Sequence, residues 1–148
     1  MGDDPQWSNL GELSVQGTRH TDILKLWLSL QHMGTAGYSE IIAHNYKMTE
    51  YCTQQVKARP HLRLASEPEM NLVCFRWEPK GLDSQQQDTL NADLQRYLLQ
   101  SDNDAIFLSL PTYRKQRWLR AVFLNPFTQL STVARLFEQV DHVVQIRQ

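Results

Sequence analysis

One ten-residue segment, RWLRAVFLNP at 117–126, constrains the fold of this chain more than any other. Its apolar composition is typical of a buried β-strand, yet it carries Arg120 near its middle. Strand alternation puts Arg120 on one face with Trp118, Val122 and Leu124, and puts three apolar side chains on the other face: Leu119, Ala121 and Phe123. Arginine keeps its proton at any ordinary pH, so burying it unpaired costs several kcal/mol. The fold must therefore give Arg120 an anionic partner or a route to water.

Two interpretations of Arg120 follow from the residues alone. In the first, the guanidinium pairs with a nearby Asp or Glu, or reaches water from a short edge strand. In the second, it holds a ligand carboxylate through two parallel hydrogen bonds, a geometry that suits arginine far better than lysine. Asn125 and Pro126 end the strand, which would place such a site near the rim of a sheet.

Length and charge limit the possible class of protein. A chain of 148 residues with 41% hydrophobic content fits one globular domain. A net charge of -1 argues against a partner that is nucleic acid or an anionic membrane. Cys52 and Cys74 lie in apolar contexts, which predicts reduced core residues. The N-terminus has no signal-peptide pattern and no segment has the length of a membrane span, so we expect a cytoplasmic protein.

Apolar spacing predicts an α+β fold that begins with two helices. Residues 21–33 carry leucines at alternate positions, which also fits a strand, but their length, leucine content and scarcity of β-branched residues favour a first helix, which Gly34 stops. Steps of three and four residues predict the second helix at 37–59, which Pro60 stops. A β-β-α-β-β-α layer follows, with strands at 62–66 and 71–78, a helix from 84, strands at 105–113 and 117–125, and a last helix from about 128.

The short connections between paired strands predict a small antiparallel sheet, with helices packed on one face. We therefore divide the chain into an extended lead-in at 1–17, linking helices at 18–60 and a C-terminal α+β small domain at 61–148.

Other candidate sites are weaker. The five histidines lack metal-site spacing, no phosphate-loop motif is present, and a mid-strand cysteine such as Cys74 is typically inert. Gly17, Thr18 and Arg19 form a turn before a helix N-terminus, where backbone N–H groups favour anions. A solvated turn explains these three residues as well as a ligand contact does.

Three ordered segments resemble the C-terminal portion of group II pyridoxal-phosphate-dependent amino-acid decarboxylases. They are GTRHTDILKLWLSLQHMGTAGYSEII at 17–42, PEMNLVCFRW at 68–77 and RWLRAVFLNPFT at 117–128. The family includes glutamate, aromatic amino-acid, cysteine sulfinate and 2,4-diaminobutyrate decarboxylases, and the glutamate or diaminobutyrate branch is most similar. The resemblance runs from about Leu13 to the C-terminus, and it implies the small domain of an aspartate-aminotransferase-like fold.

The resemblance also implies which functional groups this chain has and which it lacks. Arg120 matches the family's substrate-carboxylate arginine, while Gly17, Thr18 and Arg19 match a turn near the active site and the dimer region. The family uses pyridoxal phosphate, which acts as the electron sink when CO2 leaves. None of the five lysines here follows a histidine, as the Schiff-base lysine of the family does. We therefore expect no catalytic residue, no metal ligand and no cofactor held by this chain alone.

Two functions are consistent with these patterns. The first is the C-terminal domain or fragment of a decarboxylase acting on glutamate, 2,4-diaminobutyrate or a similar amino acid. Its partners would be the missing large cofactor domain and a second copy in a homodimer, and alone it would be inactive. The second is a non-catalytic α+β module that dimerises or binds a small acid at Arg120.

Overall fold

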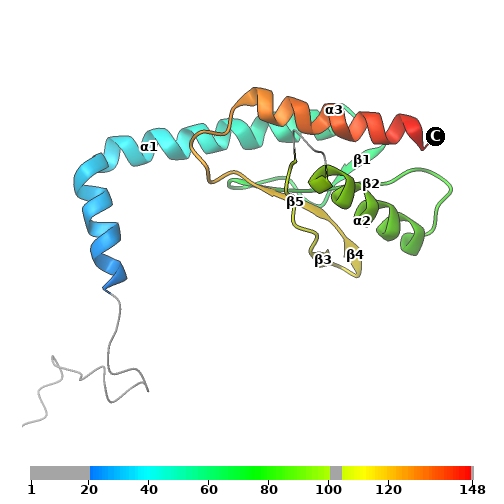
Figure 1. Cartoon of the computed structure of the whole chain (residues 1–148), viewed down its shortest axis with the longest axis horizontal. Helices are drawn as coiled ribbons and strands as arrows, with labels where there is room; N and C mark the ends of the chain where they lie inside the picture. Colours follow the sequence, from blue (N-terminus) through cyan, green and yellow to red (C-terminus); the bar gives the residue numbers. More distant parts are fainter. Residues whose placement is uncertain (1–20, 101–104, 148) are drawn as a thin grey trace, which may run out of the picture. The chain divides into compact units, whose positions relative to one another are not determined.

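The computed structural model of the protein describes residues 21–100 and 105–147 (Figure 1). The elements within these residues are, in order, α1 (Asp22–Lys57), β1 (Leu62–Leu64), β2 (Leu72–Trp77), α2 (Ser84–Gln100), β3 (Thr112–Tyr113), β4 (Gln116–Arg117), β5 (Leu119–Val122) and α3 (Leu130–Ile146). The chain divides into two compact units, one ending at Tyr38 and the other beginning at Ser39. Helix α1 contributes to both, and each unit is described by itself.

The first unit contains the leucine-rich start of α1. Gly34 has φ +63°, which L side chains rarely adopt, so the helix breaks at the glycine where the sequence predicts a stop. Seven apolar side chains of this segment are exposed: Ile23, Leu24, Leu26, Trp27, Leu28, Leu30 and Met33. At about 3.6 residues per turn they cover more than half of the helix circumference. No helix in the described part of the chain is long and apolar enough to cross a membrane.

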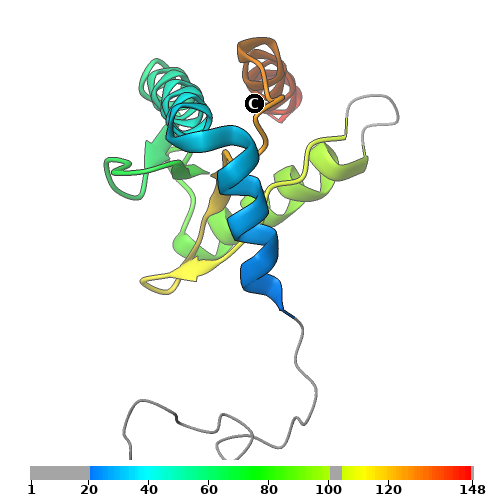
Figure 2. The same ribbon diagram turned by 90° about the vertical axis from the view of Figure 1, so that its left-hand side faces the viewer.

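The second unit is a helical layer on one face of a three-stranded antiparallel sheet, with strand order β1-β2-β5. Figure 2 shows the second part of α1 and α3 above the same face, and α2 packs against α3. Steps of three and four residues give both upper helices an apolar stripe. The core includes Met48, Cys52 and Val56 of α1, Val133, Phe137 and Val140 of α3, and Val73, Phe75 and Leu119 of the sheet. The predicted α+β class is confirmed.

Helix α2 begins with a reciprocal cap and is joined to the sheet by one asparagine. The Asp83 side chain accepts the Gln86 N–H at 2.8 Å, and the Gln86 side chain accepts the Asp83 N–H at 3.0 Å, as in a capping box. Asn91 is fully buried, and its amide pairs with the backbone N–H and C=O of Trp77 at 2.9 and 2.8 Å. This side chain therefore fixes α2 against the end of β2.

The segment at 105–113 differs from the continuous strand that the sequence predicts. Only Thr112 and Tyr113 form a strand there, paired with β4 in a two-residue hairpin, and Ser109 forms an isolated bridge to Arg120. Pro111 explains the interruption, because it accepts the Trp118 N–H at 3.0 Å but has no N–H to return. Strand β5 itself ends at Val122 and pairs with β2.

Candidate functional site

The sheet face opposite α1 and α3 carries Arg120. On β2 the side chains of Val73 and Phe75 enter the core, so alternation turns Cys74 to the other face. The register pairs Cys74 with Arg120, which makes their side chains direct cross-strand neighbours. Three residues of the β5 segment, Leu119, Ala121 and Phe123, are at most 7% exposed, so the predicted division of its faces is confirmed.

Arg120 is half-buried and bound to a neutral group. Its Nε–H donates to the Ser109 hydroxyl oxygen at 2.9 Å. Among residues 21–100 and 105–147, no carboxylate pairs with its guanidinium, and its two Nη groups have no hydrogen-bond partner. A half-buried cation whose charge is not compensated by any described carboxylate is suited to an anionic ligand. The arrangement differs from the ion pair of the first sequence interpretation. It agrees with the other form of that interpretation, because the short strand β5 lies at the edge of the sheet and Arg120 is partly exposed.

Cys74 forms the neutral side of this site. Burial raises the pKa of its thiol, and the nearby charge of Arg120 acts in the opposite direction. Burial raises the pKa of Cys52 to about 12. A thiol in its neutral form is a poor nucleophile, so both shifts support inert roles. Cys74 also lines a cavity of about 210 Å³ together with Leu72, Trp118 and Tyr113.

A second arginine on this face, Arg76, is fully buried. Its Nη2 group donates to Gln87 at 3.2 Å and to Asp88 at 3.3 Å. Its guanidinium carbon lies 5.5 Å from the centre of the Trp118 ring, within the range of a cation–π contact. Its Nε and Nη1 atoms are buried without a partner. Arg76 thus has a carboxylate partner, which Arg120 lacks among the described residues, so the two arginines have different environments on one face.

Sequence reasoning missed Arg76 and Ser109. Arg76 could have been found, because it is two positions from Cys74 in a strand and so shares its face. Ser109 is the one hydroxyl residue in the apolar run AIFLSLP, a weak signal that says nothing about its partner. The predicted turn of Gly17, Thr18 and Arg19 lies outside the described residues, so its role stays a prediction.

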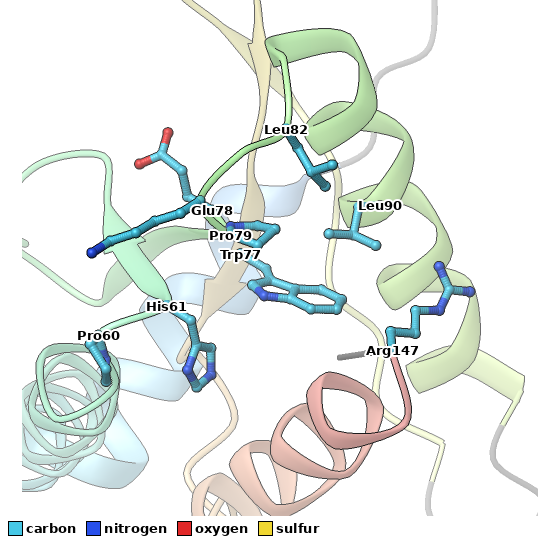
Figure 3. A pocket seen from close by; sticks show the side chains of 9 residues that line it. Pro60, His61, Trp77, Glu78, Pro79, Leu82, Leu90 and Arg147 are labelled. Carbon is cyan, nitrogen blue, oxygen red and sulfur yellow. The ribbon is translucent and has the colours of Figure 1, made fainter.

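A larger pocket of about 570 Å³ lies on the helix side of the sheet (Figure 3). The Trp77 indole extends toward Leu90 and Arg147, and His61 forms another part of the wall. Two of its charged groups have partners, since Glu78 pairs with Arg63 at 2.8 Å and Arg147 pairs with Asp93 at 3.1 Å. Trp77 belongs to the buried set of β2 and Arg120 to the opposite face, so this pocket is separate from the Arg120 site.

His61, in the wall of this pocket, has a shifted pKa. Burial lowers its pKa below the usual 6.5, the Asp141 carboxylate raises it, and the Arg59 charge lowers it. Nε2 of His61 is 3.8 Å from the Asp141 carboxylate and has no hydrogen-bond partner. In the described residues, no group of three or more His, Cys, Asp or Glu side chains could hold a metal ion.

Two comparisons with known sequences relate this chain to decarboxylases. Residues 6–78 match the model of the pyridoxal-dependent decarboxylase conserved domain. The chain is 30% identical over 132 residues to L-2,4-diaminobutyrate decarboxylase of Acinetobacter baumannii, a match covering 89% of this chain and 26% of that protein. It is 36% identical over 72 residues to cysteine sulfinic acid decarboxylase of Mus musculus, covering 49% of this chain and 15% of that protein.

Part of a solved decarboxylase structure has the same fold as this chain. Catharanthus roseus tryptophan decarboxylase in complex with L-tryptophan superposes with a TM-score of 0.77 at 20% identity, over 93% of this chain and 29% of that one. The fold is therefore shared with pyridoxal-phosphate-dependent decarboxylases. Residues 6–78 are thus similar to part of the pyridoxal-dependent decarboxylase conserved domain, and the chain is similar in sequence to decarboxylases of L-2,4-diaminobutyrate and cysteine sulfinic acid. It spans between about a seventh and a quarter of the length of these curated relatives.

Full-length enzymes of the pyridoxal-dependent decarboxylase family use pyridoxal phosphate, and none of the five lysines of this chain follows a histidine. Lys25 pairs with Asp22 at 2.7 Å and Lys57 with Glu67 at 2.8 Å, and both side chains are more than half exposed. The other three lysines, Lys47, Lys80 and Lys115, are exposed as well. A lysine that forms a Schiff base is normally activated by desolvation or by a second cation. None of the five lysines has such an environment in the described structure.

Proposed function

We propose that this chain is the C-terminal, substrate-orienting part of a pyridoxal-phosphate-dependent amino-acid decarboxylase. The observation that carries the proposal is Arg120, a half-buried guanidinium whose two Nη groups have no partner among the described residues. In this role Arg120 would hold one carboxylate of the amino acid through two parallel hydrogen bonds. A fixed carboxylate limits how the substrate can rotate, which helps to select the bond that is broken.

The proposed substrate class is an acidic or diamino acid. Support comes from the relatives, which are named as decarboxylases of L-2,4-diaminobutyrate and cysteine sulfinic acid. The site adds one observation, because Arg120 has a neutral thiol on one side and a neutral hydroxyl on the other. A single uncompensated positive charge suits a carboxylate. Which of the two carboxylates of an acidic substrate it would hold differs with the substrate.

The proposed partners are a large cofactor domain and a second copy of the chain. Exposed apolar surface supports the proposal of a large partner. Within the second unit it includes Met70, Leu124 and Phe127, which are 64%, 69% and 85% exposed. Asn45 is only 7% exposed, and its side-chain oxygen has no hydrogen-bond donor although it lines a cavity with Met70 and Leu124. A domain covering this surface would bury the apolar groups and could supply the missing donor.

A chimera tests this function. The chain replaces the matching segment of the Acinetobacter baumannii diaminobutyrate decarboxylase, and CO2 release is measured with L-2,4-diaminobutyrate and with glutamate. We expect activity with at least one substrate. Arg120→Lys should lower kcat/KM about 10- to 100-fold, because one of two charge-assisted hydrogen bonds is lost. Arg117→Lys is the matched control, since Arg117 is exposed and three residues away.

Two results would contradict the proposal. One is a folded, cofactor-loaded chimera that releases no CO2. The other is an active chimera in which Arg120→Lys and Arg117→Lys have equal effects. An inactive chimera, combined with saturable carboxylate binding by the chain itself, would instead favour the small-acid-binding module.

A further inference from the structure

Ser109 contacts Arg120 through both its backbone and its side chain. The two residues exchange backbone hydrogen bonds of 2.8 Å and 3.2 Å in an isolated antiparallel bridge. The Ser109 hydroxyl oxygen accepts the Arg120 Nε–H at 2.9 Å, and the same hydroxyl points its proton at the Arg120 carbonyl at 3.5 Å. Ser109 thus holds the arginine at two points, on its main chain and at Nε.

The surrounding sequence limits Ser109 to this single bridge. Pro111 prevents the regular ladder from continuing on one side, as described above. On the other side Leu108 is buried, and its carbonyl accepts the Gln95 side chain of α2 at 3.1 Å. The backbone on both sides of Ser109 is thereby tied down, so the position of its hydroxyl is set by the fold.

A hydroxyl at this position has a specific consequence for the guanidinium. Binding at Nε restricts the rotation of the long arginine side chain and leaves the Nη groups without a partner among the described residues. A carboxylate at residue 109 would also bind Nε, but it would cancel the positive charge and compete with an anionic ligand. A serine orients the side chain and leaves the charge available.

We propose that Ser109 is a positioning residue for Arg120, holding its Nε–H so that its Nη groups are presented to a carboxylate ligand. The proposal rests on the proposed function, in which that carboxylate belongs to the amino-acid substrate. Ser109 touches the arginine and not the ligand, so its loss should weaken carboxylate binding without abolishing it.

The test is NMR spectroscopy of the full 148-residue chain labelled with ¹⁵N-arginine. The Arg120 Nε–H signal is assigned by its loss in Arg120→Lys, and its hydrogen exchange is followed in the wild type, Ser109→Ala and Ser109→Thr. Exchange should accelerate about fivefold in Ser109→Ala, the factor expected for one net hydrogen bond, and should stay near the wild-type rate in Ser109→Thr. Gln95→Ala is the matched control, because it loosens the neighbouring Leu108 carbonyl and keeps the hydroxyl.

The same samples are titrated with acetate as the carboxylate probe and with acetamide as its neutral counterpart, at constant ionic strength. Acetate alone should shift the Arg120 signal, with affinity lowered about fivefold in Ser109→Ala and restored in Ser109→Thr. Equal affinities in wild type and Ser109→Ala, or equal losses in Ser109→Ala, Ser109→Thr and Gln95→Ala, would overturn the role of the hydroxyl. If acetate leaves the Arg120 signal unchanged in every variant, the carboxylate site itself is refuted, and the proposed function loses its main support.

Discussion

Removal of the Asn91 side chain should strongly destabilise the second unit. In Asn91→Ala, the backbone N–H and C=O of Trp77 lose the partners they have at 2.9 and 2.8 Å. Asn91 is fully buried and Trp77 is 3% exposed, so water cannot easily replace the amide. Each of the two buried groups left unpaired costs about 1–3 kcal/mol, and we therefore expect a loss of about 2–6 kcal/mol in the free energy of unfolding.

Urea unfolding followed by circular dichroism measures this loss. With a slope of about 2 kcal/mol/M, the midpoint should fall by about 1–3 M. Asn71→Ala is the matched control, because the half-buried Asn71 amide donates one hydrogen bond, to the Phe123 carbonyl at 2.9 Å. Its loss should cost about 1 kcal/mol. Equal midpoints for the two variants would show that Asn91 does not join α2 to β2 in the way described here.

Two further predictions concern titratable groups. The folded pKa of His61 lies below its unfolded value of about 6.5, so the unfolded chain binds more protons, and stability should fall as pH decreases through that unfolded value toward the folded pKa. Urea midpoints from about pH 7.5 to about pH 5 should show this slope, and His61→Gln should reduce it; an unchanged slope would refute the assignment to His61. The raised thiol pKa values predict slow labelling of both cysteines by a thiol reagent, with fully buried Cys52 slower than half-buried Cys74. Labelling of Cys52 at the rate of a free thiol in the folded chain would contradict its burial.

Local sequence patterns were sufficient to predict most of the buried faces in the second unit. Spacing of three and four residues predicted the buried stripes of α1 and α3, and alternation predicted which face of β5 enters the core. Such periodicities depend only on backbone geometry and on the exclusion of apolar groups from water. The prediction of a continuous strand at 105–113 was wrong. The apolar content of this segment satisfied a strand pattern, but Pro111 lacks the N–H donor that the ladder needs. The outcome there depended on one missing N–H group.

The candidate site shows where sequence reasoning ends. Arg120 could be singled out from the sequence because a permanent cation in an apolar strand needs a compensating group wherever the strand lies. Its partner could not be identified, since Ser109 is eleven residues away and meets it only when a short bridge forms. Arg76 is also an arginine and lies on the same face as Arg120, yet it pairs with Asp88 of α2. The difference between a structural and an available guanidinium thus depends on which element covers it.

The sequence by itself determined the residue types, their periodicities and the likeness of three segments to one family of decarboxylases. These properties are local along the chain, so they persist whatever the packing. Only the tertiary structure decided that Arg120 donates to a neutral hydroxyl and lies opposite Cys74 in the sheet, with no described carboxylate pairing with it. The physical reason is that the energy of a buried charge depends on groups brought near it in space, and those groups come from strands and loops that are distant in sequence.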